Sequence, residues 1–366
     1  MIKKYSTFVL LLTCSVSHAL TWSMREVVPS GEFDVVISGI NNAGQIAASS
    51  QYNQRALRIN PDGSTNVLQA SDTGYRFTAA GGINENGEVA VFGERRTESP
   101  GSKVSYWTPG VGLTGLVAPD PGEYFSVQSF AINNSRSAVG WAQWAGPGGS
   151  VPSGIATYYS PDSGGYLVPG NWDGDNLARD INDAGNIVGC VNLNPIRWNQ
   201  DGSYTSLALA GHYGVATSIN SSGMISGVLN SSSRRYLAIW NAAGQLVQKI
   251  DIGSRIPVPS APTDYSFIND NGDVVVTGVV NGAARQFFWS QSTGILDFTD
   301  SISNRNGFNL TIRGINNRRE IICNGYLGTN YKYNLLLTPV PEPSELVALG
   351  VGLVGVGLTR LKRKAA

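Results

Sequence analysis

One short phrase recurs along the 366-residue chain: Ile-Asn, two variable residues and Gly, followed by apolar residues. Five complete copies begin at Ile40, Ile83, Ile181, Ile219 and Ile268, and two copies that lack the Gly begin at Ile132 and Ile315. The seven Asn residues follow one another at intervals of 43, 49, 49, 38, 49 and 47 residues. A period of about 40 to 50 residues is typical of solenoids, propellers and arrays.

Each copy has the composition of a tight turn between two strands. Asn favours the first position of a type I turn, and Gly three residues later supplies a positive φ. In the second repeat, the pattern predicts strands over residues 76–83, 88–92, 104–107 and 112–117. Forty-four Gly residues and the absence of a long helical periodicity also favour an all-β chain with four strands per repeat.

An aromatic residue recurs near the end of the third strand of the repeats. These residues are Trp107, Tyr159, Trp198, Trp240 and Trp289. A large aromatic side chain at a fixed place in each unit is most simply a packing wedge between neighbouring units.

The two ends of the repeat array complement each other. The last repeat has expected strands over 310–315, 320–323 and 333–337, and then reaches Pro339 without a fourth strand. An additional strand, 23–28, precedes the first Ile-Asn. Pairing of this strand with 333–337 would complete the last repeat and hide exposed edges. We therefore expect residues 20–339 to form a seven-bladed β-propeller whose N-terminal strand closes the last blade.

Residues 1–19 have the pattern of a secretory signal peptide. Lys3 and Lys4 precede the apolar run 8–12, and the small residues Ser17 and Ala19 follow it. This order predicts cleavage after Ala19 and export of the rest of the chain.

The C-terminal segment, residues 340–366, has three parts in a fixed order. A Pro-Glu-Pro motif precedes the short apolar stretch 346–358, and a basic cluster ends the chain. The motif and cluster residues are Val340, Pro341, Glu342, Pro343, Ser344, Arg360, Lys362, Arg363 and Lys364. The stretch is short for a permanent transmembrane helix, and its basic flank favours the cytoplasmic side.

This tail resembles the PEP-CTERM sorting signal of Gram-negative bacteria that produce exopolysaccharide. The resemblance implies an exosortase as partner, transient anchoring in the inner membrane and cleavage near Pro-Glu-Pro. It also implies final location at the cell surface or in the extracellular matrix of a biofilm.

The body resembles the HAF family of extracellular repeats over most of residues 22–338. The Ile-Asn half of the repeat is well kept, as in residues 181–189. The His-Ala-Phe triplet that names the family is lost: the segment 285–289 keeps only its Phe and Trp. Membership of this family implies an extracellular location and does not imply a particular activity.

Few residues of the body are suited to catalysis or to metal binding. Of the two His residues, His18 lies in the signal, which leaves His212 as the only one expected in the exported chain. Cys190 and Cys323 fall in different repeats and are expected to be buried, inert thiols. The segment from Asp180 lacks the alternating oxygen ligands of a calcium loop. We expect no catalytic residues, no bound metal and no cofactor.

Charge excludes nucleic acid as a partner. Outside the signal and the tail, the chain has 20 basic and 24 acidic residues and no basic stripe. A structural or carbohydrate-binding protein is therefore the first hypothesis. Because Asp173, Asp175 and Asp180 lie close in sequence, a propeller glycosidase or polysaccharide lyase acting on extracellular polysaccharide is the alternative.

A glycan-binding patch is expected around the third repeat. Three expected loops, 119–125, 141–153 and 170–176, would bring together aromatic side chains and carboxylates. The predicted patch consists of Tyr124, Trp141, Trp144, Trp172, Asp173 and Asp175. Aromatic faces beside carboxylates suit sugar rings, which present C–H faces and hydroxyls.

Overall fold

The computed structural model describes most of the repeat body. The described residues are 20–27, 34–68, 75–95, 102–117, 124–144, 154–160, 164–167, 176–199, 203–254, 265–303, 305, 307–327 and 331–340. Among them the chain is all-β apart from one 3-10 turn, η1 (Thr299–Ser301). The predicted signal peptide and nearly all of the predicted sorting tail lie outside these residues.

Four sheets of the described body have four antiparallel strands each, in sequence order. The first holds β2 (Val35–Ile40), β3 (Ile46–Ser50), β4 (Arg55–Ile59) and β5 (Thr65–Val67). The second holds β6 (Tyr75–Ile83), β7 (Val89–Arg95), β8 (Ser102–Thr108) and β9 (Gly112–Val117). The third holds β10 (Tyr124–Ile132), β11 (Ala138–Trp144), β12 (Gly154–Ser160) and β13 (Gly164–Leu167). The fourth holds β14 (Asn176–Ile181), β15 (Ile187–Val191), β16 (Asn194–Trp198) and β17 (Tyr204–Ser206).

A larger sheet comes next in the chain, made of two groups of four strands. The first group is β18 (Tyr213–Ile219), β19 (Ile225–Asn230), β20 (Arg234–Trp240) and β21 (Leu246–Ser254). The second group is β22 (Ser266–Ile268), β23 (Val274–Val280), β24 (Ala283–Ser290) and β25 (Gly294–Asp297). The two groups are joined through one parallel residue pair, Gly253 of β21 with Val279 of β23.

The last sheet combines the two ends of the described chain. Its strands, in spatial order, are β26 (Ile302–Ser303), β1 (Trp22–Glu26), β29 (Tyr331–Pro339), β28 (Ile321–Leu327) and β27 (Asn309–Ile315). Strand β1 pairs antiparallel with β29, from Trp22 opposite Pro339 to Glu26 opposite Leu335. These are the two segments that the sequence analysis pairs.

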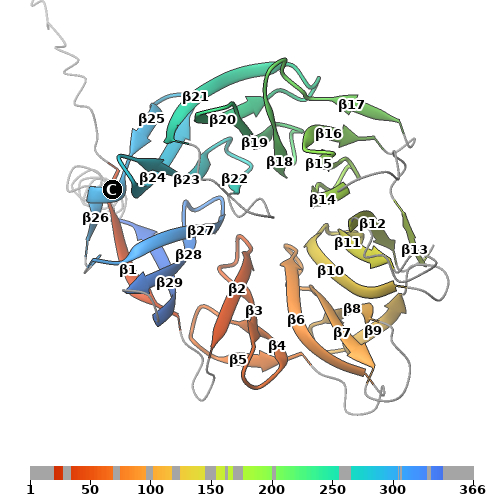
Figure 1. Cartoon of the computed structure of the whole chain (residues 1–366). Coiled ribbons are helices and arrows are strands. Elements are labelled where there is room, and N and C mark those ends of the chain that lie inside the picture. The colour runs from red at the N-terminus through yellow and green to blue at the C-terminus, as the bar shows by residue number, and fades with distance from the viewer. Residues whose placement is uncertain are drawn as a thin grey trace, which may run out of the picture.

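The sheets are arranged as a ring (Figure 1). The strands nearest the centre are the first strands of each group, namely β2, β6, β10, β14, β18, β22 and β27. Six of these seven strands skip one or two residues in their pairing shortly before the Ile of Ile-Asn. Such a β-bulge bends a strand and re-aims the residues beyond it. Each Ile-Asn turn therefore extends from the end of a bent inner strand.

The bulge of β6 contains Gly81 and Gly82 because the neighbouring inner strand passes very close. A Cβ on Gly81 would lie 2.4 Å from the Ser129 carbonyl oxygen, and one on Gly82 would lie 2.8 Å from the Ala131 Cα. No side chain fits at that distance, so the inner strands β6 and β10 approach each other through glycine.

The hydrophobic core lies between neighbouring sheets. The recurring aromatics of the third strands are all buried, and each belongs to a cluster that spans two neighbouring groups of four strands. Trp107 of β8, for example, packs with Ala47 and Ala56 of the preceding sheet. The predicted role of these aromatics as wedges between units is confirmed.

Candidate functional site

The seven Asn residues of the Ile-Asn turns form a closed circle of hydrogen bonds at the centre of the ring, here called the Asn ring. The Nδ2 of each Asn donates to the backbone carbonyl oxygen of the next. The bonds are Asn41 to Asn84 (3.0 Å), Asn84 to Asn133 (3.0 Å), Asn133 to Asn182 (3.2 Å), Asn182 to Asn220 (3.1 Å), Asn220 to Asn269 (3.0 Å), Asn269 to Asn316 (3.0 Å) and Asn316 to Asn41 (3.1 Å).

Each of these Asn residues also closes its own turn. The Oδ1 accepts the backbone N–H four residues later in all seven copies, as from Asn41 to Gln45 at 2.9 Å. An Asp could accept this bond as well as Asn can, but it has no N–H to donate across to the next turn. The bond between turns is therefore the reason that every copy has Asn.

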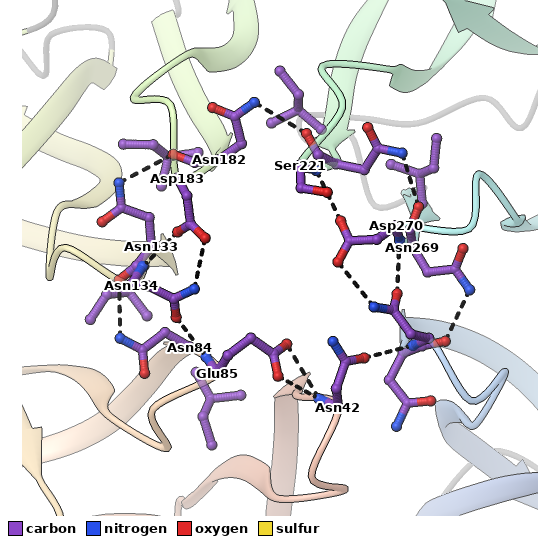
Figure 2. A pocket seen from close by; sticks show the side chains of 18 of the residues that line it. Asn42, Asn84, Glu85, Asn133, Asn134, Asn182, Asp183, Ser221, Asn269 and Asp270 are labelled. Atoms are coloured by element: carbon purple, nitrogen blue, oxygen red, sulfur yellow. Dashed lines mark hydrogen bonds between the residues drawn. The ribbon is translucent and has the colours of Figure 1, made fainter.

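The residue after each Asn forms a second ring, here called the rim. The rim residues are Asn42, Glu85, Asn134, Asp183, Ser221, Asp270 and Asn317. Between six of the seven neighbouring pairs of rim residues, the backbone N–H of one residue donates a hydrogen bond to a side-chain oxygen of the next (Figure 2). The exception is the N–H of Asp183, which has no acceptor among the described residues. The side chain of its neighbour Ser221 is shorter than the others.

The rim and the Ile residues of the turns surround a cavity of about 170 Å³, here called the axial pocket. Figure 2 shows the rim side chains around it. Residues of all seven turns line the pocket. It opens to solvent, because Glu85, Asp183 and Asp270 are exposed side chains.

The axial pocket is negatively charged. Its charged lining residues are Glu85, Asp183 and Asp270, which come from alternate turns, and no Lys or Arg belongs to the described lining. The pocket wall partly desolvates the Glu85 carboxylate although the residue is exposed to solvent, which raises its pKa, and the charges of Asp270 and Asp183 add to this. Partial desolvation also acts to raise the pKa of Asp270, but hydrogen bonds from Asn317 and Ser221 outweigh it, so this pKa lies below its ordinary value.

Two residues of β14 that precede its Ile-Asn turn hold charged groups inside the ring. Asp180 accepts hydrogen bonds from Ser218 Oγ, from the Ile219 N–H and from the Ile181 N–H, each at 2.9 Å. Burial raises its pKa to about 6. The bonds from Ser218 and Ile219 join β14 with β18, whereas the bond from Ile181 lies within β14.

Arg179 occupies the bulge of β14. Its Cζ lies 4.5 Å from the ring centroid of Phe130 and 4.8 Å from that of Tyr265. Phe130 belongs to β10, and Tyr265 directly precedes β22, so this guanidinium joins three inner segments of the ring by cation–π contacts.

The predicted glycan patch is only partly covered by the described residues. The backbones of Tyr124 and Trp144 are paired opposite each other in the β10–β11 ladder. Trp141 lies over Gly154 of β12, where an added Cβ would be 1.3 Å from its Nε1. These three aromatics belong to strands and not to loops, which corrects the prediction: the β10–β11 hairpin pairs as far as Trp144. Trp172, Asp173 and Asp175 lie outside the described residues.

The predicted sorting motif also lies almost entirely outside the described residues, which end at Val340. The Val340 N–H donates to the Thr21 carbonyl oxygen at 2.9 Å. Among the described residues, no helix is long and apolar enough to cross a membrane, and the predicted apolar stretch 346–358 is not among them.

The few residues suited to catalysis lie apart. His212 is partly exposed between β17 and β18, with its Nδ1 3.0 Å from the Ala210 carbonyl oxygen. Cys190 and Cys323 are buried free thiols, as predicted, and burial raises the pKa of Cys323 well above its ordinary value. No group of three His, Cys, Asp or Glu residues in the described part of the chain could hold a metal ion.

Sequence reasoning missed the axial pocket. The rim position directly follows the repeated Asn, and it holds an acid in every second copy from Glu85 to Asp270. That alternation is the sequence signal that points to the pocket. A phrase interpreted only as a turn gives no indication that it also forms the wall of a cavity.

Known proteins resemble this chain in structure and not in sequence. No family model matches it, and no curated protein matches it. A streptogramin B lyase structure is 11% identical, with a TM-score of 0.54, over 87% of this chain and 98% of that one. The virginiamycin B lyase from Staphylococcus aureus is 13% identical, with a TM-score of 0.54, over 87% of this chain and 100% of that one.

A third structure is the β-propeller domain of the Trilobed protease from Pyrococcus furiosus, at 12% identity and a TM-score of 0.49. The match covers 84% of this chain and 98% of the protease domain. Identities this low show a likeness of fold alone. The described part of the chain has an all-β fold, and one of its structural neighbours is named as a β-propeller domain.

Proposed function

We propose that this chain is an exported, non-catalytic propeller that serves as a structural or carbohydrate-binding protein at the cell surface or in the extracellular matrix. The observation that carries the proposal is the Asn ring. The polar residue that defines the repeat is engaged in holding neighbouring sheets together, so the repeat itself encodes a scaffold. Binding would then belong to residues that vary between copies, such as the rim.

We propose that the scaffold has seven blades and is closed by its N-terminal strand. The seven Ile-Asn turns, which form one hydrogen-bonded circle, support the number. The large sheet also supports a count of seven blades, because its two groups of four strands are joined through a single residue pair and can be counted as two blades. Closure is supported by the pairing of β1 with β29. The Asn317 N–H also donates to Asn42 Oδ1 at 2.7 Å, between the last turn and the first.

Export and sorting are proposed from the resemblance of the tail to PEP-CTERM signals, with an exosortase as partner. The bond from Val340 to Thr21 supports a compact body whose two processing segments leave from adjacent positions. In this proposal the body is held briefly at the inner membrane and is then released toward exopolysaccharide outside.

The sorting proposal is tested by replacing Pro341, Glu342 and Pro343 with Ala in a host that has an exosortase. We expect the variant to stay in the inner membrane and to keep its basic C-terminal end. Replacing the exposed Ala242 and Ala243 with Ser is the matched control and should leave release unchanged. Normal release of the Ala variant would remove the tail from the proposal.

The carbohydrate-binding proposal is tested by titrating the purified protein with the exopolysaccharide of its host. Binding is expected to quench Trp fluorescence. If the predicted patch takes part, the double variant Trp144→Ala and Trp172→Ala should lose the quenching. Unchanged quenching in that variant would exclude the patch while leaving binding itself in place.

The alternative function is a propeller glycosidase or polysaccharide lyase. It is favoured by one observation: two of the structural neighbours are lyases by name. Incubation of the purified body with exopolysaccharide distinguishes the two functions. New reducing ends or unsaturated products would support the enzyme, whereas binding without cleavage would support the scaffold.

A further inference from the structure

We propose that the axial pocket binds one six-membered sugar ring that carries a free amino group, which is a hexosamine unit. This inference rests on the proposed carbohydrate-binding function and gives it a ligand class. It concerns the rim residues, which lie at the centre of the ring, and is separate from the predicted patch on β10 and β11.

The size of the axial pocket fits one sugar ring. Its volume is about 170 Å³. A cavity of about 150 Å³ is known to hold one benzene ring. A pyranose ring has the same number of ring atoms, and its larger substituents can extend into solvent because the acidic rim side chains are exposed. Two linked sugar rings would not fit, so we expect the end of a glycan or a single branch to enter.

The hydrogen-bonding groups of the rim suit a ligand that carries several donors. The two carboxylate oxygens of Asp183 accept bonds from the Asn134 N–H and from Asn134 Nδ2. A carboxylate oxygen can accept a second bond, so capacity remains toward the pocket. Sugar hydroxyls and an ammonium group are donors of this kind. At the gap beside Ser221, the N–H of Asp183, which has no acceptor among the described residues, offers a donor to a sugar oxygen.

The negative charge of the axial pocket favours a sugar that carries a positive charge. Three carboxylates of the lining share one pocket with no Lys or Arg in the described lining. The pKa of Glu85 is raised, mainly by desolvation and additionally by the charges of Asp270 and Asp183. An ammonium group would relieve this repulsion and form charge-assisted hydrogen bonds. A uronic acid would add a fourth negative charge and be repelled. Because the carboxylates come from alternate turns, they surround a ring-shaped ligand rather than converge on one point.

The experiment is calorimetric titration of the purified protein with glucosamine, glucose and glucuronate at low ionic strength. We expect glucosamine to bind, glucose to bind at least about tenfold more weakly, and glucuronate not to bind. The Glu85→Gln variant should weaken glucosamine binding by about tenfold or more, since a charged hydrogen bond is lost. Asp62→Asn, at an exposed turn that does not line the pocket, is the control and should change nothing.

A second variant keeps the test decisive if Glu85→Gln folds poorly. Ser221→Asn supplies the acceptor that the Asp183 N–H lacks, as Asn134 and Asn317 do for their neighbours. We expect this variant to fold at least as stably and to lose glucosamine binding, because the added side chain fills the gap. Retention of full binding in Ser221→Asn would overturn the proposed placement.

Three other results would also overturn the inference: no glucosamine binding, equal binding of glucose and glucosamine, or displacement of glucosamine by micromolar calcium. The proposed carbohydrate-binding function is judged separately by co-sedimentation with exopolysaccharide. If Glu85→Gln and the unaltered chain sediment equally and glucosamine does not bind, the pocket assignment fails and the function stands. If glucosamine binds but no polysaccharide sediments, the pocket stands and the function fails.

Discussion

The Nε of Arg136 donates to the Glu88 carboxylate at 2.8 Å, and Arg136 occupies the place that Gly holds in the complete Ile-Asn turns. It keeps the positive φ of a turn glycine, at 62°. The other turn without Gly repeats the arrangement: Arg319, with a φ of 60°, bonds the buried Asp273 through Nε and Nη2. In both cases the acid follows the Gly of the preceding turn. The two incomplete copies are therefore ion-paired junctions between neighbouring sheets.

Replacing Arg136 by Gly should destabilise the protein although Gly suits the backbone there. Relief of the positive φ contributes about 1 kcal/mol, whereas a buried carboxylate loses a charged hydrogen bond worth about 1.5 to 3 kcal/mol. The net loss should be about 1 kcal/mol. A double-mutant cycle with Glu88→Gln, followed by denaturant unfolding, should give a coupling free energy of about 1 to 2 kcal/mol. Additive changes would show that the two side chains do not stabilise each other.

Asn133→Asp separates the two tasks of the repeated Asn. The new carboxylate can still accept the Ser137 N–H, but it places an oxygen against the Asn182 carbonyl oxygen where Nδ2 now donates. We expect a loss of about 2 to 3 kcal/mol in the free energy of unfolding. Asn241→Asp is the matched control, since among the described residues that Asn bonds only within its own exposed turn. It should cost about 0.5 kcal/mol or less, and equal losses would contradict the role of the Asn ring.

Trp22→Ala should loosen β1 within the last sheet. Trp22 is fully buried, its ring centroid lies 4.5 Å from that of Phe298, and its Nε1 donates to the Arg319 carbonyl oxygen at 3.2 Å. Truncation of a buried Trp costs about 3 to 5 kcal/mol, and Trp22→Phe should cost clearly less. Thermal unfolding measures both. An unchanged Tm for Trp22→Ala would mean that β1 does not hold the ring together.

Asp180 should make stability fall as pH rises from about 4 to about 6. Its pKa is raised by burial from 3.8 to about 6 in the folded protein, so the folded state holds a proton that the unfolded state has released. Ionisation of Asp180 in the folded protein therefore lowers the free energy of unfolding by up to about 3 kcal/mol, and the full loss is reached above pH 6. Unfolding by urea at several pH values should show this fall in the unaltered chain and a flatter profile in Asp180→Asn. Parallel profiles would assign the slope to other groups.

Local patterns in the sequence were sufficient for the all-β class, the four-strand repeat and the packing between strand groups, although the observed β7 and β8 are longer than the expected strands 88–92 and 104–107. The strands expected over 76–83 and 112–117 correspond to β6 and β9, with at most one residue of difference. The buried aromatics follow from the same period, because a large apolar side chain at a fixed place in each repeat must pack on a neighbour. The segments 23–28 and 333–337 were matched by counting the strands in each repeat. The predicted start of the loop 141–153 was wrong because β11 continues to Trp144. No local sequence signal indicates where the two strands of a hairpin stop pairing.

Only the tertiary structure decided what the repeated polar residues do. The sequence explained Asn as a turn residue, a role that Asp fills equally well, and so it left the choice of Asn in all seven copies without a reason. The reason is a bond to a carbonyl group 38 to 49 residues away, or 275 residues away between Asn316 and Asn41. In the same way, Glu85, Asp183 and Asp270 meet around one pocket because bent inner strands carry their turns to a common axis. The spacing of these residues along the chain does not reveal that they lie close together in the folded ring.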